Sequence, residues 1–279
     1  MRKKSAHTAG MGELAGAVLF SQWNGFCELQ ERVLRQGDID SIHDLRVASR
    51  RMRATVGLFA PFMAGKTVKK ISKALRRVTR ALGRLRNIDE AVIYFGALPA
   101  PLPALAGMLS ADREEELKAV RDVLKPFPRQ EMDRMLRESV AELAGTPCDD
   151  QALPVYLSEK SIQRYQAVYD LLVPATIPEN VETRHALRIA IKKWRYLLET
   201  LGQICQHDYS ATLETLKEYQ SLLGSLNDML EFAALCDTLT LPVHEREEIK
   251  VALARDSAAY LARFIETAAV RPLNYTFSL

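Results

Sequence analysis

The sequence predicts an all-α protein, and three observations support this fold class. Apolar residues recur at helical spacing through long segments, whereas no run of four to eight β-branched or aromatic residues alternates in the manner of a strand. Apolar residues make up 48% of the 279 residues, enough to fill a substantial core. Two sequence motifs also recur in the same order and at nearly the same distance, which indicates two related helical halves.

Proline and glycine divide the chain into nine expected helices, because both residues commonly mark helix ends. The breaks fall at Gly37, between Pro61 and Gly65, between Pro99 and Pro103, at Pro126 and Pro128, between Gly145 and Pro147, at Pro174 and Pro178, and at Pro242. We therefore expect helices at residues 11–36, 39–62, 66–97, 104–124, 128–145, 152–172, 182–206, 209–239 and 243–268.

The proline-containing segment from Gly145 to Pro154 is the expected boundary between the halves. This boundary predicts an N-terminal tail at residues 1–11, a first helical half at 12–147, a second at 148–268 and a C-terminal tail at 269–279.

Composition indicates a soluble cytoplasmic protein. No window approaches the roughly 18 to 20 apolar residues of a membrane-spanning helix, and the basic start is not followed by an apolar signal core. The cysteines lack the spacing of a disulfide framework or a zinc site, so we expect buried free thiols. They are Cys27, Cys148, Cys205 and Cys236.

An internal repeat organises the chain. Residues 43–53 read HDLRVASRRMR, and residues 185–195, 142 positions later, read HALRIAIKKWR. A second pair follows at an offset of 141, with LGRLRNIDE at 82–90 and LGSLNDMLE at 223–231. Two motifs in the same order and register indicate a duplication.

Each repeat carries a stripe of basic side chains. At about 100° per residue, the His and the three cations of a repeat fall within roughly 80° of one another on the helix. The two stripes are His43, Arg46, Arg50 and Arg53, and His185, Arg188, Lys192 and Arg195. Basic side chains grouped in this way repel one another, and protein surfaces normally reduce such repulsion by placing acidic residues between them. We therefore expect a bound anion to offset the repulsion.

The following helix of the first half carries a longer cationic strip. Its eight Lys and Arg residues occupy an arc of about 120° over nearly 30 Å of helix. They are Lys66, Lys69, Lys70, Lys73, Arg76, Arg77, Arg80 and Arg84. Residues 43–86 hold thirteen basic residues and one acid, a net +12, so the rest of the chain carries −9 against the total of +3. The second half keeps Lys217 at the position of Arg76 but has Glu or Ser at the equivalents of Lys73, Arg77, Arg80 and Arg84.

A strip of this length suits a linear polyanion better than one small phosphate. Nucleic acid is a competing ligand, although residues 66–86 contain no aromatic side chain for stacking bases and no nucleic-acid-binding motif is present. An acidic partner protein and internal ion pairs to acidic helices are further alternatives. Membrane-surface binding is disfavoured, because the apolar faces of these helices are expected to pack in the core.

The sequence offers no catalytic or metal centre. It lacks the HExxH, HD-pair, P-loop and ExExK motifs, and the neighbours His43 and Asp44 point about 100° apart on a helix. We therefore expect no catalytic residue, no metal and no cofactor. The less favoured alternative is an enzyme that hydrolyses polyphosphate or relays phosphate through His43 or His185. Gly83 and Gly224, inside helical patterns, are expected to permit close helix packing.

These residues resemble the CHAD family of α-helical domains over roughly residues 12–268. The resemblance rests on the two repeats at His43 and His185, on Tyr196 after Arg195, and on the motifs that begin at Leu82 and Leu223. It implies one CHAD-type unit of two antiparallel four-helix bundles related by a pseudo-twofold axis, with a basic groove or pore between them. It also implies binding of inorganic polyphosphate and association with polyphosphate granules. From the residues themselves we expect binding without catalysis, and neither a specific nucleic acid nor a membrane as partner. A triphosphate-tunnel domain often accompanies the family, and the expectation here is a stand-alone version.

One position departs from the family pattern, because Asn87 stands where an acidic residue is usual, while Asp89 and Asp228 are kept. If these acids orient basic side chains, Asn87 is expected to hold its arginine more loosely. The candidate polyphosphate-binding residues are His43, Arg46, Arg50, Arg51, Arg53, Lys66, Lys69, Lys70, Lys73, Arg76, Arg77, Arg80, Arg84, His185, Arg188, Lys192, Lys193, Arg195 and Lys217.

Overall fold

The computed structural model describes residues 10–145 and 152–275, which form nine α-helices, one 3₁₀ turn and no strand within those ranges. The all-α prediction is therefore confirmed. The helices are α1 (Met11–Arg35), α2 (Ile39–Leu58), α3 (Gly65–Gly96), α4 (Pro103–Leu124), α5 (Arg129–Gly145), α6 (Ala152–Ala175), α7 (Val181–Cys205), α8 (Ser210–Asp237) and α9 (Val243–Val270), and the 3₁₀ turn η1 is Ala60–Phe62.

The helix ends differ from expectation at prolines. The expected helix 39–62 stops at Leu58 and continues as η1, which contains Pro61. Pro154 lies in the first turn of α6, where a missing N–H is tolerated, and α6 continues through Pro174. The predicted boundary at residues 147 and 148, together with Cys148, lies outside the described residues.

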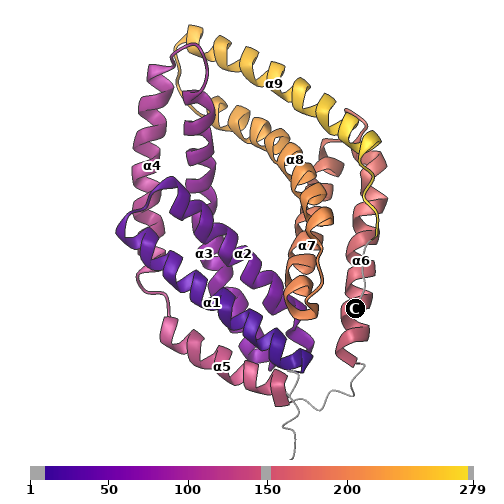
Figure 1. The fold of residues 1–279 in the computed structure, drawn as a ribbon. Coiled ribbons are helices and arrows are strands. Elements are labelled where there is room, and N and C mark those ends of the chain that lie inside the picture. The colour runs from indigo at the N-terminus through magenta and orange to yellow at the C-terminus, as the bar shows by residue number, and fades with distance from the viewer. Residues whose placement is uncertain (1–9, 146–151, 276–279) are drawn as a thin grey trace, which may run out of the picture.

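Consecutive helices pack side by side. In the first half α1 to α4 follow one another and α5 packs along α1, while α6 to α9 follow one another in the second half. Figure 1 shows the two groups beside each other. The sequence repeat equates α2 with α7 and α3 with α8, which leaves α5 without a counterpart among the described helices of the second half. The pseudo-twofold relation between the halves stays a prediction.

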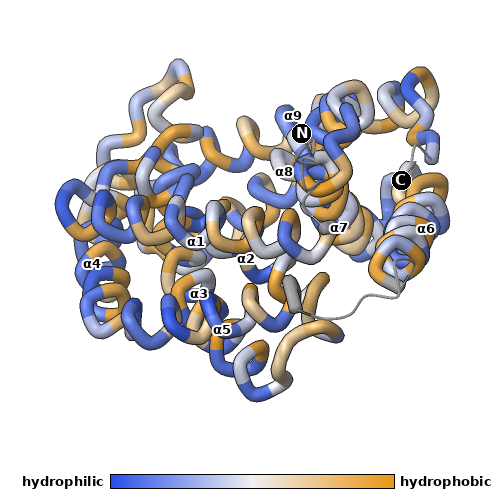
Figure 2. The backbone as a smooth tube through the Cα atoms, turned by 60° about the horizontal axis from the view of Figure 1, so that its bottom comes forward, coloured by the Kyte–Doolittle hydropathy of each residue, from blue (hydrophilic) through white to orange (hydrophobic). Residues whose placement is uncertain are grey.

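Both hydrophobic clusters cross from one half to the other. The larger joins Trp23 and Phe26 of α1 to Trp194 of α7 and Tyr219 of α8, all of them almost fully buried. The smaller joins the end of α3 and the start of α4 to α8 and α9, and its Phe95 and Phe232 rings lie 5.6 Å apart. Figure 2 shows hydrophobic and hydrophilic residues alternating along the helices. This shared core fixes α2 against α7.

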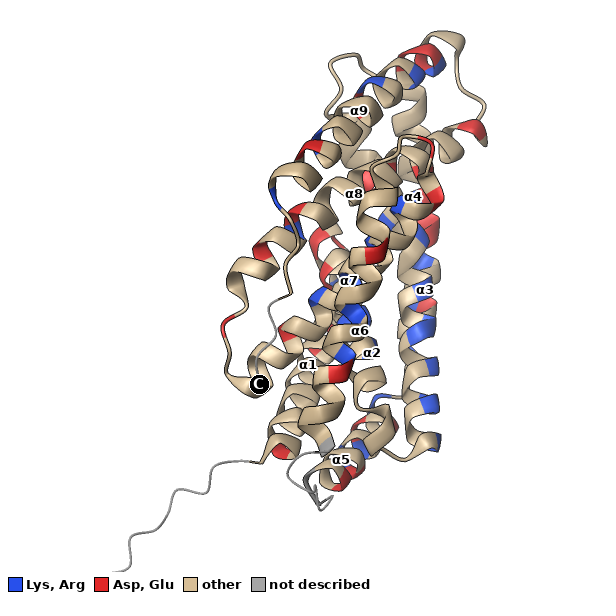
Figure 3. Ribbon diagram, turned by 90° about the vertical axis from the view of Figure 1, so that its right-hand side faces the viewer, with Lys and Arg blue, Asp and Glu red and all other residues tan. Residues whose placement is uncertain are grey.

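Charge is unevenly distributed over the helices. In Figure 3 blue Lys and Arg segments follow the long α3 helix, whereas acidic segments are spread over other helices. No described helix is long and apolar enough to cross a bilayer.

Candidate functional site

Helix α2 presents its basic stripe because its opposite face is buried. The helix begins at an N-cap, where the Asp38 side chain accepts a hydrogen bond from Ser41 N at 2.8 Å. Ile42, Leu45 and Met52 are completely buried, which directs the stripe of His43, Arg46, Arg50 and Arg53 away from the core.

Helix α7 presents the matching stripe for the same reason. Leu187, Ile191 and Trp194 are completely buried. Helices α2 and α7 pack together, and the hydroxyl oxygens of Thr55 and Thr200 lie 3.4 Å apart across this contact. The two predicted stripes are therefore brought to one place.

Four cations from the two stripes form a central cluster, which we define as Arg46 and Arg50 of α2 with Arg188 and Lys192 of α7. Among the described residues, no carboxylate oxygen lies within 4.0 Å of their charged nitrogens. The Nε of Arg188 is buried without a hydrogen-bond partner. The three arginines of the cluster therefore hold positive charge that the surrounding protein does not neutralise by direct pairing.

The electrostatics of the central cluster reflect burial and mutual repulsion. Burial, and then the neighbouring arginines, lower the pKa of Arg46 to about 10. The same causes lower the pKa of Lys192 to about 6. Arg86 of α3 and Asp228 of α8 adjoin the cluster, and burial lowers the pKa of Arg86 and raises that of Asp228.

A cleft of about 540 Å³ opens beside the central cluster between α2, α6 and α7. Its lining contains six basic side chains and no acidic one. The basic residues are Arg50, Arg53, Lys160, Arg164, Lys192 and Lys193. Tyr156, Tyr196 and apolar side chains complete the wall. A cleft with this lining attracts anions and excludes cations.

Three of the basic residues at this site were missed by the sequence analysis. Lys160 and Arg164 lie on α6, four residues apart and hence on one face of that helix, which is the signal that could have found them. Arg86 lies within the recognised second motif but was not selected. The repeat drew attention to matched positions, and these three have no basic counterpart in the other half.

The cationic strip of α3 borders the cleft without lining it. Its eight side chains are all exposed. Arg76 is close enough to Arg53 to lower the pKa of Arg53 further, after burial has done so. Lys70 is paired with Glu131 of α5, and Arg84 Nε lies 3.1 Å from Glu116 of α4. Two of the eight cations are therefore partly neutralised, and the strip meets the cleft at Arg76.

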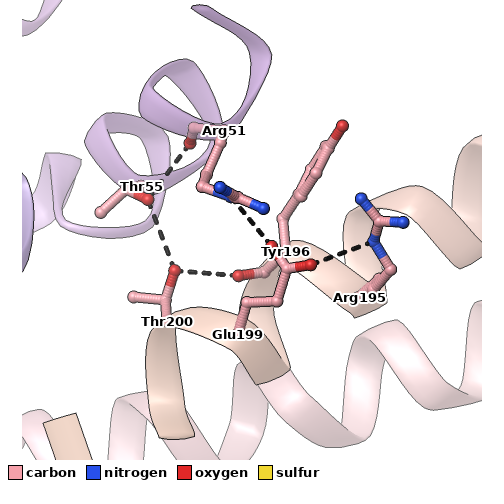
Figure 4. A network of polar contacts seen from close by, with 6 residues as sticks. All are labelled: Arg51, Thr55, Arg195, Tyr196, Glu199 and Thr200. Carbon is pink, nitrogen blue, oxygen red and sulfur yellow. Dashed lines mark hydrogen bonds and ion pairs between the residues drawn. The ribbon is translucent and has the colours of Figure 1, made fainter. Parts of the chain in front are cut away.

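Two of the predicted binding residues, Arg51 and Arg195, are each paired with the carboxylate of Glu199. Glu199 lies between them, with Oε2 at 3.0 Å from Arg51 Nε and Oε1 at 3.2 Å from Arg195 Nε (Figure 4). The contact between Arg51 and Glu199 joins α2 to α7. Arg51 therefore helps to hold the halves together, whereas the Arg195 pair lies within α7, and the binding role of both arginines stays a prediction.

The remaining candidates are dispersed. His185 Nδ1 lies 3.0 Å from Asn227 Oδ1, within hydrogen-bond distance. Partial burial of the ring and then the nearby Arg86 lower the pKa of His43. Lys217 lies in a separate groove between α8 and α9, beside Glu214 and Glu218, and is not part of the cleft.

Asn87 and the two helical glycines, Gly83 and Gly224, each have a different environment. Asn87 donates to Glu231 at 3.3 Å and so contacts α8, while Arg86 pairs with Glu90 at 2.5 Å. A Cβ on Gly83 would lie 3.1 Å from Arg46 Nη1, so the absence of a side chain there admits the guanidinium. Nothing lies within 4 Å of a Cβ on Gly224, and the packing role predicted for that glycine is wrong.

Metal-binding geometry is absent from the described part of the chain, where no three His, Cys, Asp or Glu side chains gather to hold an ion. Cys27 and Cys236 are buried free thiols and Cys205 is partly buried.

Comparisons with known proteins are consistent with this fold. A family model described as the CHAD domain matches residues 17–237. A solved CHAD domain from the plant Ricinus communis is 18% identical, with a TM-score of 0.64 over 96% of this chain and 89% of that chain. PptA from Streptomyces chartreusis is also 18% identical, with a TM-score of 0.58 over 94% of this chain and 100% of that chain. No curated protein matches. At this identity the two structures establish the fold alone.

Proposed function

The chain belongs to the CHAD domain family, and from that premise we propose that it binds inorganic polyphosphate in the cleft between α2, α6 and α7. One observation carries the proposal: the cleft is lined by six basic side chains and no acidic one, and it adjoins the central cluster, whose four basic side chains have no carboxylate within 4.0 Å among the described residues. Partly buried arginines without counter-ions are costly, and a bound polyanion offsets that cost.

The shape of the basic surface favours a chain over a single ion. The cleft volume of about 540 Å³ is far larger than one phosphate group requires. Beyond Arg53 and Arg76 the surface continues along the exposed strip of α3. A linear polymer can occupy the cleft and extend over the strip, whereas a small anion can use only part of it.

The aromatic residues of the cleft do not offer stacking platforms for bases. The Tyr156 hydroxyl donates to Leu58 O at 2.8 Å, and its ring packs edge-on against Phe62. Tyr196 is only 7% exposed. Since sequence-tolerant binding of single-stranded nucleic acid relies on accessible aromatic faces, the cleft suits a bare phosphate chain better.

In this proposal the arginines form paired hydrogen bonds to phosphate oxygens, and the lysines supply point charges. The proposed role is binding alone, and holding the polymer requires no general base and no metal cluster. Association with polyphosphate granules would follow from this binding in a cell that accumulates the polymer.

The proposal predicts a preference among polyanions. Long-chain polyphosphate, single-stranded DNA and polyglutamate of matched total charge should be compared by competition binding across a salt series. We expect polyphosphate to bind most tightly, with a steep fall in affinity as salt rises, because several phosphates are contacted at once. Equal affinity for all three polymers would reduce the site to a generic cationic surface and contradict the proposal.

A further inference from the structure

Lys192 occupies an unusual position for a lysine. Its side chain lines the cleft, yet the residue is only 7% exposed. Among the described residues it has neither a hydrogen-bond partner nor a carboxylate within 4.0 Å. An ammonium group is strongly hydrated, so a lysine held in this way is disfavoured in its charged form.

The groups that face Lys192 reinforce this effect. Arg188 from its own helix and Arg50 and Arg46 from α2 repel a positive charge, and Asp228 from α8 only partly opposes them. Lys160 and Arg164 of α6 line the same cleft. With a pKa of about 6, the amine is mostly uncharged in the empty cleft at neutral pH. An uncharged amine is a nucleophile, whereas an ammonium is not.

The same cations also select which electrophiles reach the amine. Arg50 lines the cleft with Lys192, and Arg188 lies one helical turn before it. Guanidinium groups bind phosphate in a paired geometry, so a reagent that carries a phosphate group is concentrated beside the amine. A neutral reagent gains no such advantage.

We propose that Lys192 is a modification site of the cleft, acylated by small acyl phosphates whose phosphate group is held by Arg50 and Arg188. The amine nitrogen attacks the acyl carbon, a C–N bond forms and the C–O bond to phosphate breaks. Of the two amine protons one stays on the amide nitrogen and the other leaves with the phosphate, which departs as HPO₄²⁻. No oxidant, reductant or metal is needed. The arginines stabilise the departing dianion as they would a bound phosphate.

Acylation changes the cleft in two ways. It converts an amine that can gain a proton into a neutral amide, and it adds an acyl group to a cleft of about 540 Å³. Both changes weaken the cleft as an anion site. The reaction itself needs no polyphosphate, so this inference stands or falls separately from the proposed function.

The purified full-length chain provides the test. It is incubated with acetyl phosphate at pH 7.5, and acetylation at each lysine is followed by peptide sequencing in the mass spectrometer. The adjacent Lys193 is the internal control, because it lines the same cleft but is exposed. We expect Lys192 to be acetylated at least roughly tenfold faster than Lys193, since most of its amine is uncharged. An equal or slower rate at Lys192 would overturn the proposal.

A second experiment tests whether the phosphate group of the reagent directs it to Lys192. The rates are measured again with the neutral reagent N-hydroxysuccinimidyl acetate, and in an Arg50→Gln/Arg188→Gln variant shown by circular dichroism to fold. We expect the preference for Lys192 over Lys193 to shrink with the neutral reagent and in the variant. A preference that is the same with both reagents and in both proteins would overturn the assignment to acyl phosphates.

Discussion

At the residue scale, basic side chains that look equivalent in the sequence have different roles. Arg50 and Arg51 are neighbours on α2, yet Arg50 lines the cleft while Arg51 pairs with Glu199 of α7. Both arginines belong to the predicted binding residues because a charge pattern shows where cations gather and not which acid lies across from them. Glu199 is 148 residues from Arg51, and only the packing of α2 on α7 brings the two together.

This difference predicts opposite phenotypes for two neighbouring substitutions. Arg50→Gln should weaken polyphosphate binding roughly ten- to a hundredfold, the loss expected for a charge-assisted contact, with little change in melting temperature. Arg51→Gln should lower the free energy of unfolding by about 1 kcal/mol and leave binding within roughly threefold of the wild type. Calorimetric melting and binding titrations separate the two effects. Equal loss of binding in both variants would contradict the assignment.

Lys192 predicts how binding depends on pH. A bound polyanion raises the pKa of this amine above its value of about 6 in the empty cleft. Below pH 6 the lysine is charged in both states, so affinity is at its maximum. Above pH 6 the empty cleft loses the proton that the bound state keeps, and affinity should fall up to about tenfold per pH unit until the bound-state pKa is reached.

The control for this prediction is Lys192→Met, which removes the titrating group. Dissociation constants for long-chain polyphosphate between pH 5.5 and 8.5 should depend less steeply on pH in the variant than in the wild type. Identical slopes in the two proteins would show that other groups, such as His43, set the pH dependence.

At the element scale, the sequence predicted the helices well because proline and glycine mark most of their ends. The errors lie where a proline is tolerated inside a helix, as in α6, or where the chain tightens into a 3₁₀ turn, as in η1. The spacing of Lys160 and Arg164 marks a basic face on α6, but the sequence does not show that this face forms a wall of the cleft. Which face a helix presents depends on its packing partner, and α6 packs mainly on α7.

The two helical glycines predict a contrast between equivalent positions. Gly224→Ala should raise the melting temperature, because alanine favours the helix by up to about 1 kcal/mol and the added Cβ enters open space. Gly83→Ala should gain less and should weaken binding, because its Cβ would lie 3.1 Å from Arg46 Nη1. Thermal melting and polyphosphate titration of both variants test this contrast, and indistinguishable behaviour would contradict it.

At the scale of the whole molecule, the shared core makes the two halves one structural unit. The sequence concentrates positive charge in the first half, where residues 43–86 carry a net charge of +12. The structure places much of that charge on the exposed strip of α3, whereas the cleft takes four of its six basic side chains from α6 and α7. Binding is therefore expected to depend on both halves.

The most direct measurement is the affinity for long-chain polyphosphate of an Arg50→Gln/Arg188→Gln variant, which loses one cation from each half of the site. A matched control, Arg134→Gln/Lys250→Gln, removes two charges from exposed positions on α5 and α9. We predict that the first variant loses at least roughly a hundredfold in affinity at physiological salt and that the control stays within a few-fold of the wild type. Equal small losses in both would show that net charge alone holds the polymer, and would contradict a cleft site shared by α2 and α7.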